Sequence, residues 1–177
     1  SIKNKEVDIC AIFQTFHDEC RDHGVRNDIP YIKHRKEVWD RLSKLKNKYK
    51  TISKKLPFQD YIEKLANSKV CISPFGQGEL CFRDFEAMLT GTILIRPDQS
   101  NVITSPSIFE EGETYIGCKL DWSDLEEKIE NTLDNFSELN EKFTNNIRNK
   151  FNKEYTLEKF CLHYYNIFNN LETVSKE

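Results

Sequence analysis

Closely spaced glycines followed by charged side chains form the pattern in this sequence that is best suited to binding and chemistry. The residues are, in chain order, Gly76, Gly78, Glu79, Arg83 and Glu86. The arginine suits a diphosphate, because its guanidinium offers two parallel charge-assisted hydrogen bonds. A carboxylate suits the diol of a ribose, because it accepts hydrogen bonds from adjacent hydroxyl groups. Together these side chains predict a nucleoside diphosphate ligand, and the alternative is that they pair with one another within the protein.

The segment around these residues reads as strand, loop, helix, turn and strand. Short apolar runs at Val70–Ile72 and Ile93–Ile95 are typical of buried parallel strands. Helical spacing predicts a helix over Glu79–Leu89, and Gly91 is placed to end it in a left-handed conformation. The expected buried face of this helix consists of Phe82, Phe85 and Leu89. The two glutamates and the arginine then occupy neighbouring positions on the first two turns, beside a helix N-terminus that attracts an anion.

The rest of the chain alternates in the same way between apolar runs and helical patterns. Val7–Phe13 is the best candidate for a first, central strand, and Ser123 with Glu126 forms a capping-box pattern at a helix start. The other expected elements are helices over His34–Lys50, from Pro57, over Ser137–Phe151 and over Leu157–Leu171, and strands at Lys50–Ser53 and Thr114–Ile116. This alternation predicts one α/β domain over residues 1–177, with a Rossmann-like, doubly wound, mainly parallel sheet, helices on both faces and a helical C-terminus.

The composition of the chain limits the partners that the protein can bind and the cell compartments in which we expect it. The chain has 177 residues and a net charge of -3, which gives no general case for binding nucleic acid or an anionic membrane. No apolar run approaches the ~20 residues needed to span a bilayer, and the polar N-terminus is not a signal peptide. The six cysteines form no C-x-x-C pair, and Cys10 and Cys71 lie in expected buried strands. Scattered structural thiols indicate a reducing compartment, so we expect a cytoplasmic protein.

Several catalytic motifs are missing from the sequence. The glycine loop does not match GxxxxGK[ST], and no GxGxxG follows the first expected strand, which argues against a nucleoside triphosphatase and a simple dinucleotide dehydrogenase. Neither G-x-S-x-G nor H-E-x-x-H occurs. Within the long irregular segment Gln14–Ile32, His17-Asp18 with Glu19 is the one dense local group that could be catalytic or bind metal. No set of side chains has metal-ligand spacing, so we expect neither a metal nor a cofactor.

Two helical surfaces leave alternatives open. The helix over His34–Lys50 carries many lysines and arginines, which indicates either a solvated surface or a nearby phosphate or acidic partner. The terminal helix over Leu157–Leu171 has a wide apolar face rich in Phe and Tyr. This face packs either on the protein's own sheet or against a domain that this chain lacks.

Two motifs resemble those of glycosyltransferases with the GT-B fold, in particular the group-1-like and exostosin-like branches. The first is Ser73-Pro74-x-Gly76-x-Gly78-Glu79 … Arg83-x-x-Glu86-Ala87-Met88-x-x-Gly91-Thr92, which is similar to the donor-binding motif. The second is Phe109-Glu110-Glu111-Gly112-Glu113-Thr114-Tyr115 followed by Asp121-Trp122-Ser123-Asp124-Leu125, which is similar to F-x-x-G-x-x-Y-x … D-x-x-D-L. The resemblance covers about residues 69–133, and beyond them only the order of elements agrees.

This resemblance implies a C-terminal, donor-binding half of a glycosyltransferase that transfers a hexose or pentose from a UDP- or GDP-sugar to a glycan or protein acceptor. It implies that Glu86 holds the ribose, and that Arg83 and the loop of Gly76, Gln77, Gly78 and Glu79 face the diphosphate and donor sugar. Arg35 is a further diphosphate candidate. Glu79 corresponds to the first position of the family's paired glutamates, although its spacing to Glu86 is one residue shorter than in the commonest retaining branch. An N-terminal GT-B domain would supply the acceptor side, and Glu79 is the catalytic candidate that the resemblance offers in this chain.

Overall fold

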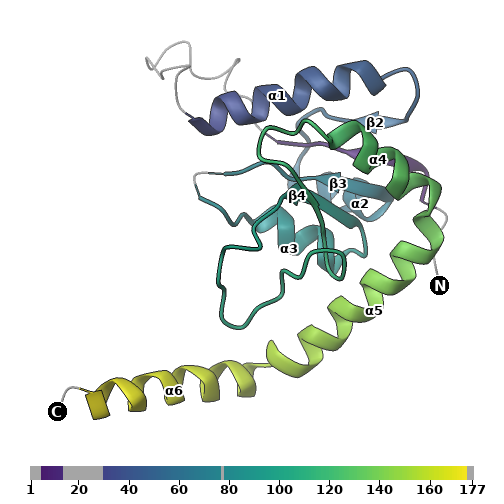
Figure 1. Ribbon diagram of the computed structural model, residues 1–177. Coiled ribbons are helices and arrows are strands. Elements are labelled where there is room, and N and C mark those ends of the chain that lie inside the picture. Colours follow the sequence, from purple (N-terminus) through teal and green to yellow (C-terminus); the bar gives the residue numbers. More distant parts are fainter. Residues whose placement is uncertain (1–4, 14–29, 77, 175–177) are drawn as a thin grey trace.

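A five-stranded, all-parallel sheet forms the centre of the computed structural model, which describes residues 5–13, 30–76 and 78–174, with side chains in 5–13, 32–76 and 78–167 (Figure 1). The strands are β1 (Val7–Cys10), β2 (Thr51–Ile52), β3 (Ser68–Ile72), β4 (Ile93–Pro97) and β5 (Ile116–Cys118). Their order in the sheet is β2-β1-β3-β4-β5, and every neighbouring pair is parallel. The Rossmann-like α/β class predicted from the sequence is confirmed. The first strand lies inside the sheet as expected, but β3 is the central strand.

Helices cover both faces of this sheet, as Figure 1 shows. The helices are α1 (Pro30–Leu45), α2 (Phe58–Ala66), α3 (Phe82–Leu89), α4 (Leu125–Asp134), α5 (Phe136–Glu154) and α6 (Leu157–Val174). Apolar side chains of α1 and α4 pack on one face, where Val38, Leu42 and Ile129 are buried. On the other face, α2, α3 and α5 bury Leu65, Met88 and Phe143 among others. Apolar layers therefore cover both faces of the sheet, and the carboxyl ends of its strands remain the place where a ligand can bind.

Cysteines take part in the core as small apolar side chains. Cys10 of β1 and Cys71 of β3 are fully buried and lie opposite each other in the parallel register. The cysteines among the described residues are all free thiols. The structural role predicted for Cys10 and Cys71 is confirmed.

Two local predictions from the sequence are wrong. Phe82 is 87 % exposed and Leu89 is 69 % exposed, so the buried side of α3 is made by Asp84, Ala87 and Met88 instead. Asp124 rather than Ser123 occupies the N-cap position of α4, and its side chain makes no capping hydrogen bond. The amide of Ser123 donates to Asp121 Oδ1 (2.9 Å), an Asx turn that places this residue before the helix.

Replacing Gly91 by alanine is expected to lower the free energy of unfolding by about 1–2 kcal/mol. Gly91 follows α3 with φ of +65°, a left-handed conformation that costs little only for glycine. An added Cβ would meet no atom closer than Thr144 Oγ1 at 3.7 Å, so the cost is one of backbone conformation. Urea unfolding measures the difference, with Gly78→Ala as the control because its Cβ would face open space. Equal stability of the two variants would contradict this account.

Candidate functional site

A cleft of about 740 Å³ opens at the carboxyl ends of β1 and β2, beside the start of α3. Its lining comes from residues after β1, from Trp39 of α1, from the loop after β2, from α2, and from α3 with the residue before it. The chain passes from β1 outward to β2 and then back across to β3, so the order of the strands reverses between β1 and β3. Such a switch point is where open α/β sheets bind ligands, because the connections leave in opposite directions and expose the strand ends.

Arg83 lies in this cleft, on the first turn of α3. Its Nε donates to the carbonyl oxygen of Ile12 (3.1 Å), and its Nη1 donates to Ser73 Oγ (3.3 Å). The guanidinium also lies 5.5 Å from the ring centroid of Phe13. These contacts use two of its five N–H donors and hold a permanent positive charge between the ends of β1 and β3. The predicted position of Arg83 at an anion site is consistent with this geometry.

Glu86 lies in the same cleft, one turn further along α3. Its Oε2 accepts a hydrogen bond of 2.8 Å from the hydroxyl of Tyr61, which belongs to α2. Burial raises the pKa of the Tyr61 phenol, and the hydrogen bond to Glu86 adds to the shift. Tyr61 is therefore a protonated donor to this carboxylate at neutral pH. The structure brings Arg83 and Glu86 together, and it adds Tyr61, which the sequence pattern did not single out.

Gly76 and Gly78 are not among the residues that line the cleft, and Gly76 lies between Cys81, which does line it, and Arg35 of α1. Arg35 is buried on α1, and its Nε donates to the carbonyl oxygen of Phe75 (2.9 Å). The ring of Phe75 stacks on His34 with centroids 4.8 Å apart. Within the loop, the amide of Gly76 donates to the carbonyl oxygen of Gly78 (3.2 Å). Arg35 thus lies beside Gly76 as a second cation at the strand edge, while one loop amide is engaged within the loop itself.

Glu79 does not occupy the position predicted for it. The helix begins at Phe82, so Glu79 precedes the helix and is not on one helical surface with Arg83 and Glu86. Its carbonyl oxygen accepts hydrogen bonds from Arg96 Nη2 (2.6 Å) and Gln99 Nε2 (3.2 Å), which tie this segment to β4 and the residues after it. The side chain of Glu79 is exposed, and Gln77 lies outside the described residues.

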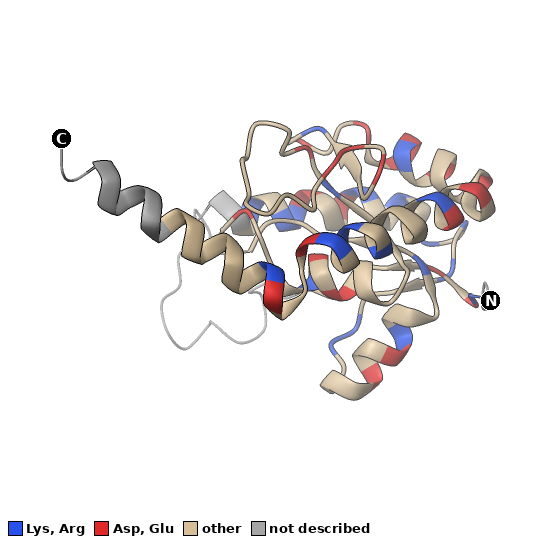
Figure 2. Ribbon diagram, turned by 90° about the horizontal axis from the view of Figure 1, so that it is seen from below, with Lys and Arg blue, Asp and Glu red and all other residues tan. Residues whose placement is uncertain are grey.

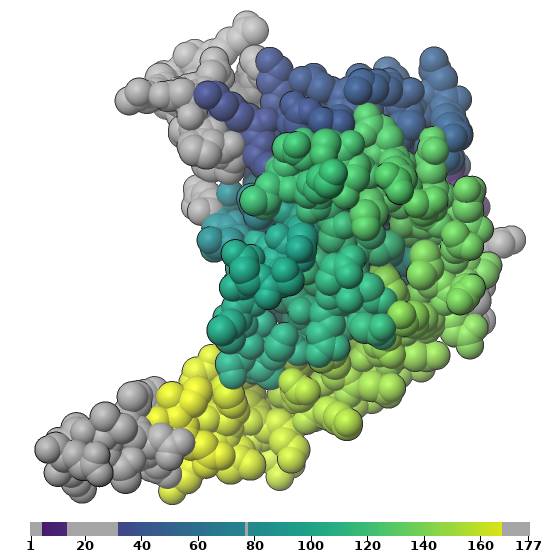
Figure 3. All heavy atoms as spheres, viewed as in Figure 1, coloured from purple at the N-terminus to yellow at the C-terminus, as the bar shows by residue number. Residues whose placement is uncertain are grey.

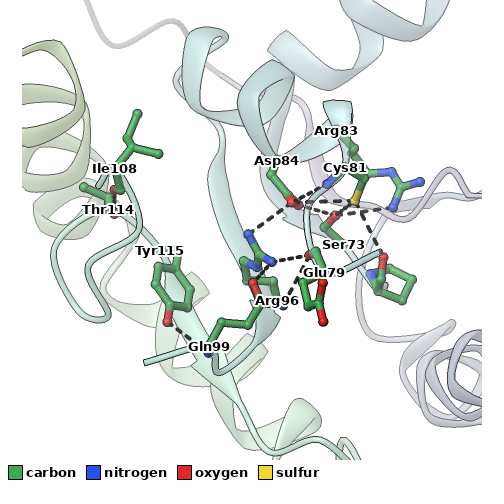
Figure 4. A network of polar contacts seen from close by, with 11 residues as sticks. Ser73, Glu79, Cys81, Arg83, Asp84, Arg96, Gln99, Ile108, Thr114 and Tyr115 are labelled. Carbon is green, nitrogen blue, oxygen red and sulfur yellow. Dashed lines mark hydrogen bonds and ion pairs between the residues drawn. The ribbon is translucent and has the colours of Figure 1, made fainter. Parts of the chain in front are cut away.

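A buried polar network fixes the start of α3 (Figure 4). Asp84 Oδ1 accepts from the hydroxyl of Ser73 (2.6 Å), and its Oδ2 accepts from the amide of Cys81 (3.1 Å). Arg96 Nη1 lies 3.1 Å from Asp84 Oδ2, an ion pair by distance in which both side chains are 1 % exposed. Arg96 also bonds to the side chain of Gln99. This network ties β3, β4 and the glycine loop together behind the cleft.

The ion pair also changes the expected electrostatics of the helix terminus. The carboxylate of Asp84 lies in the first turn of α3, accepts a hydrogen bond from the amide of the N-cap residue Cys81, and places a negative charge at the positive end of the helix. Attraction for an anion must therefore come mainly from Arg83 and the other cations at the cleft. The sequence signal for the pair is Arg96, because an arginine within the apolar run Ile93–Pro97 requires a buried carboxylate partner.

No metal site is formed by the described part of the chain, where no group of three or more His, Cys, Asp or Glu residues could hold an ion. Cys81 lines the cleft, but burial and the nearby Asp84 raise the pKa of its thiol. A protonated thiol is a poor nucleophile and metal ligand. The group His17, Asp18 and Glu19 lies outside the described residues.

We compared the sequence with protein-family models and with curated proteins, and neither comparison found a match. The described helices include none with the length and apolar character that a membrane crossing requires.

Proposed function

We propose that this chain is the donor-binding domain of a glycosyltransferase and that its cleft binds the nucleoside diphosphate of a UDP- or GDP-sugar. The observation that carries the proposal is the joint presence of Arg83 and Glu86 in one cleft at the strand-order reversal. An arginine and a carboxylate one helical turn apart match a ligand with a diphosphate at one end and a diol at the other. Neither a bare phosphate nor a bare sugar uses both groups.

The remaining lining of the cleft supports a nucleotide of this kind. Phe13, Trp39 and Tyr61 supply aromatic surface against which a base can pack, and Lys54 and Lys55 follow β2 at the opposite wall. The rings of Phe13 and Trp39 are themselves in contact, with centroids 5.2 Å apart. Base stacking on such side chains contributes about 1–3 kcal/mol by comparison with aromatic platforms in nucleic-acid binding proteins.

In the proposed reaction, a sugar passes from the nucleotide to a glycan or protein acceptor, and the diphosphate departs. Arg83 stabilises the negative charge that develops on the departing diphosphate, and Arg35 stands at the neighbouring glycine loop. This chemistry needs no cofactor. The acceptor would be bound by an N-terminal domain facing the same edge of the sheet, so this chain by itself should bind the donor better than it turns it over.

The terminal helix favours a role in docking, either to such a domain or to another protein. Figure 1 and Figure 3 show α6 extending away from the sheet and its covering helices. Phe160 is 47 % exposed and Tyr165 is 63 % exposed, so the apolar face does not pack on the protein's own sheet. Among the α6 side chains that the structure describes, up to residue 167, Figure 2 shows charge only near the start of the helix, where the sequence has Glu158 and Lys159. A nucleotide-binding or partner-docking module without chemistry is the alternative function.

Replacing Glu86 by glutamine is expected to weaken the binding of UDP or GDP about tenfold, because a hydrogen bond to a charged group is replaced by a neutral one. The amide keeps the size of the side chain, so the fold should be unchanged. Isothermal titration calorimetry measures the affinity, and circular dichroism checks the fold. The control is Glu141→Gln, which changes an exposed glutamate of α5. Unchanged affinity in Glu86→Gln would show that this carboxylate does not hold the ribose.

A further inference from the structure

Tyr61 and Glu86 form a pair of side chains in the cleft, and the direction of their hydrogen bond determines which groups of a ligand can bind to them. The phenol has a single O–H proton, and that proton is directed to Glu86 Oε2 across 2.8 Å. An ionised carboxylate has no proton to donate. Both groups consequently present only acceptor sites to a ligand, although a tyrosine hydroxyl by itself can act in either role.

This acceptor-only character selects the chemistry of the group bound here. A phosphate or a carboxylate would place its own acceptors against those of the pair, which is unfavourable. Two adjacent hydroxyl groups can each donate a hydrogen bond, one to Glu86 and one to the carboxylate or the Tyr61 oxygen. Arg83 is three residues earlier on the same helix, at ~5–6 Å between Cβ atoms, so an anionic group lies within one nucleotide unit of the diol.

The packing around Tyr61 keeps its hydroxyl at this carboxylate. Tyr61 lies on the first turn of α2, where its amide donates to the carbonyl oxygen of Pro57 (2.9 Å). Its ring contacts that of Phe58 with centroids 6.4 Å apart, and it belongs to the apolar layer on this side of the sheet. Because the ring is anchored by the core, its hydroxyl restricts the rotation of the Glu86 carboxylate.

We propose that Tyr61 is a positioning residue that orients Glu86 to recognise an intact vicinal diol, so that the cleft selects ribonucleoside diphosphates over their 2′-deoxy forms. This inference rests on the proposed function, because it assumes that a nucleoside diphosphate is the ligand. It extends that function by assigning the discrimination between ribose and deoxyribose to two residues on different helices.

The test compares UDP with 2′-deoxy-UDP by calorimetry in four forms of the 177-residue chain: unmodified, Tyr61→Phe, Glu86→Gln and the double variant. The unmodified chain should prefer UDP. Tyr61→Phe should reduce that preference about 2- to 10-fold, the range for the loss of one hydrogen bond, and should have no further effect in the Glu86→Gln background. The ratio of the affinities for UDP and 2′-deoxy-UDP is informative, because a general loss of protein stability would weaken the binding of both nucleotides equally.

Tyr165→Phe is the matched control, since it removes the hydroxyl of an exposed tyrosine on α6. If UDP binds and the preference for it is the same in Tyr61→Phe as in the unmodified chain, the role assigned to Tyr61 is overturned and the proposed function stands. If neither nucleotide binds the unmodified chain, the proposed function fails, and the inference about Tyr61 fails with it.

Discussion

Replacing Asp84 by alanine is expected to lower the free energy of unfolding by about 3–5 kcal/mol, because it leaves the charge of Arg96 buried without its partner. Both side chains are 1 % exposed, so water cannot replace the lost carboxylate. The substitution also removes the acceptor for the hydroxyl of Ser73 and for the amide of Cys81. Urea unfolding followed by circular dichroism measures the change.

The ion pair can be separated from the other contacts of Asp84 by a double-mutant cycle. The double variant Asp84→Ala with Arg96→Met should be more stable than the sum of the two single changes predicts, because it removes both charges together. Arg96→Met alone should also be destabilising, because the guanidinium holds the carbonyl oxygen of Glu79 and lies 4.4 Å from the ring centroid of Phe109. Strictly additive single effects would contradict the view that this pair is one electrostatic unit.

Replacing Arg83 by methionine is expected to weaken the binding of UDP or GDP about 100-fold, because a diphosphate loses its charge-assisted hydrogen bonds. Methionine keeps an unbranched apolar stem in place of that of arginine, so the loss is mainly one of charge. Calorimetry at two salt concentrations measures the effect. The unmodified chain should bind the nucleotide more weakly at high salt, and the affinity of the variant should depend less on the salt concentration.

Arg148→Met is the control for this substitution, because Arg148 is an exposed arginine of α5, an element that does not line the cleft. The thermal unfolding midpoint of Arg83→Met should be recorded as well, since the side chain bonds to Ile12 and Ser73 within the protein. If the Arg83→Met chain folds and binds UDP or GDP with the affinity of the unmodified chain, Arg83 does not bind the diphosphate.

Local patterns were sufficient to predict most elements of this fold. The apolar runs Val70–Ile72 and Ile93–Ile95 lie within β3 and β4, and Gly91 has the left-handed conformation expected after a helix. The buried stripe of Val38, Leu42 and Leu45 on α1 also follows directly from its spacing. Each of these features has a local sequence pattern, an apolar run, helical spacing or a glycine after a helix, which is why the sequence predicts it.

The segment before α3 could not be predicted in the same way, because contacts between distant residues determine it. Arg96 of β4 and Gln99 after it donate to the carbonyl oxygen of Glu79, so this segment is tied to the sheet and lies outside the helix that its sequence predicts. Tyr61 and Glu86 are 25 positions apart in the sequence, and only the packing of α2 beside α3 brings them together. A sequence motif therefore predicts Arg83 and Glu86 of the candidate site, whereas Tyr61 is found only from the tertiary structure.

Calorimetric titration of the unmodified chain with UDP and with GDP tests the central proposal most directly, with inorganic pyrophosphate as the comparison ligand. The account predicts saturable one-to-one binding of at least one nucleotide, and weaker binding of pyrophosphate, which reaches Arg83 but offers Glu86 no diol. Absence of nucleotide binding at millimolar concentration, or equal affinity for pyrophosphate, would contradict it.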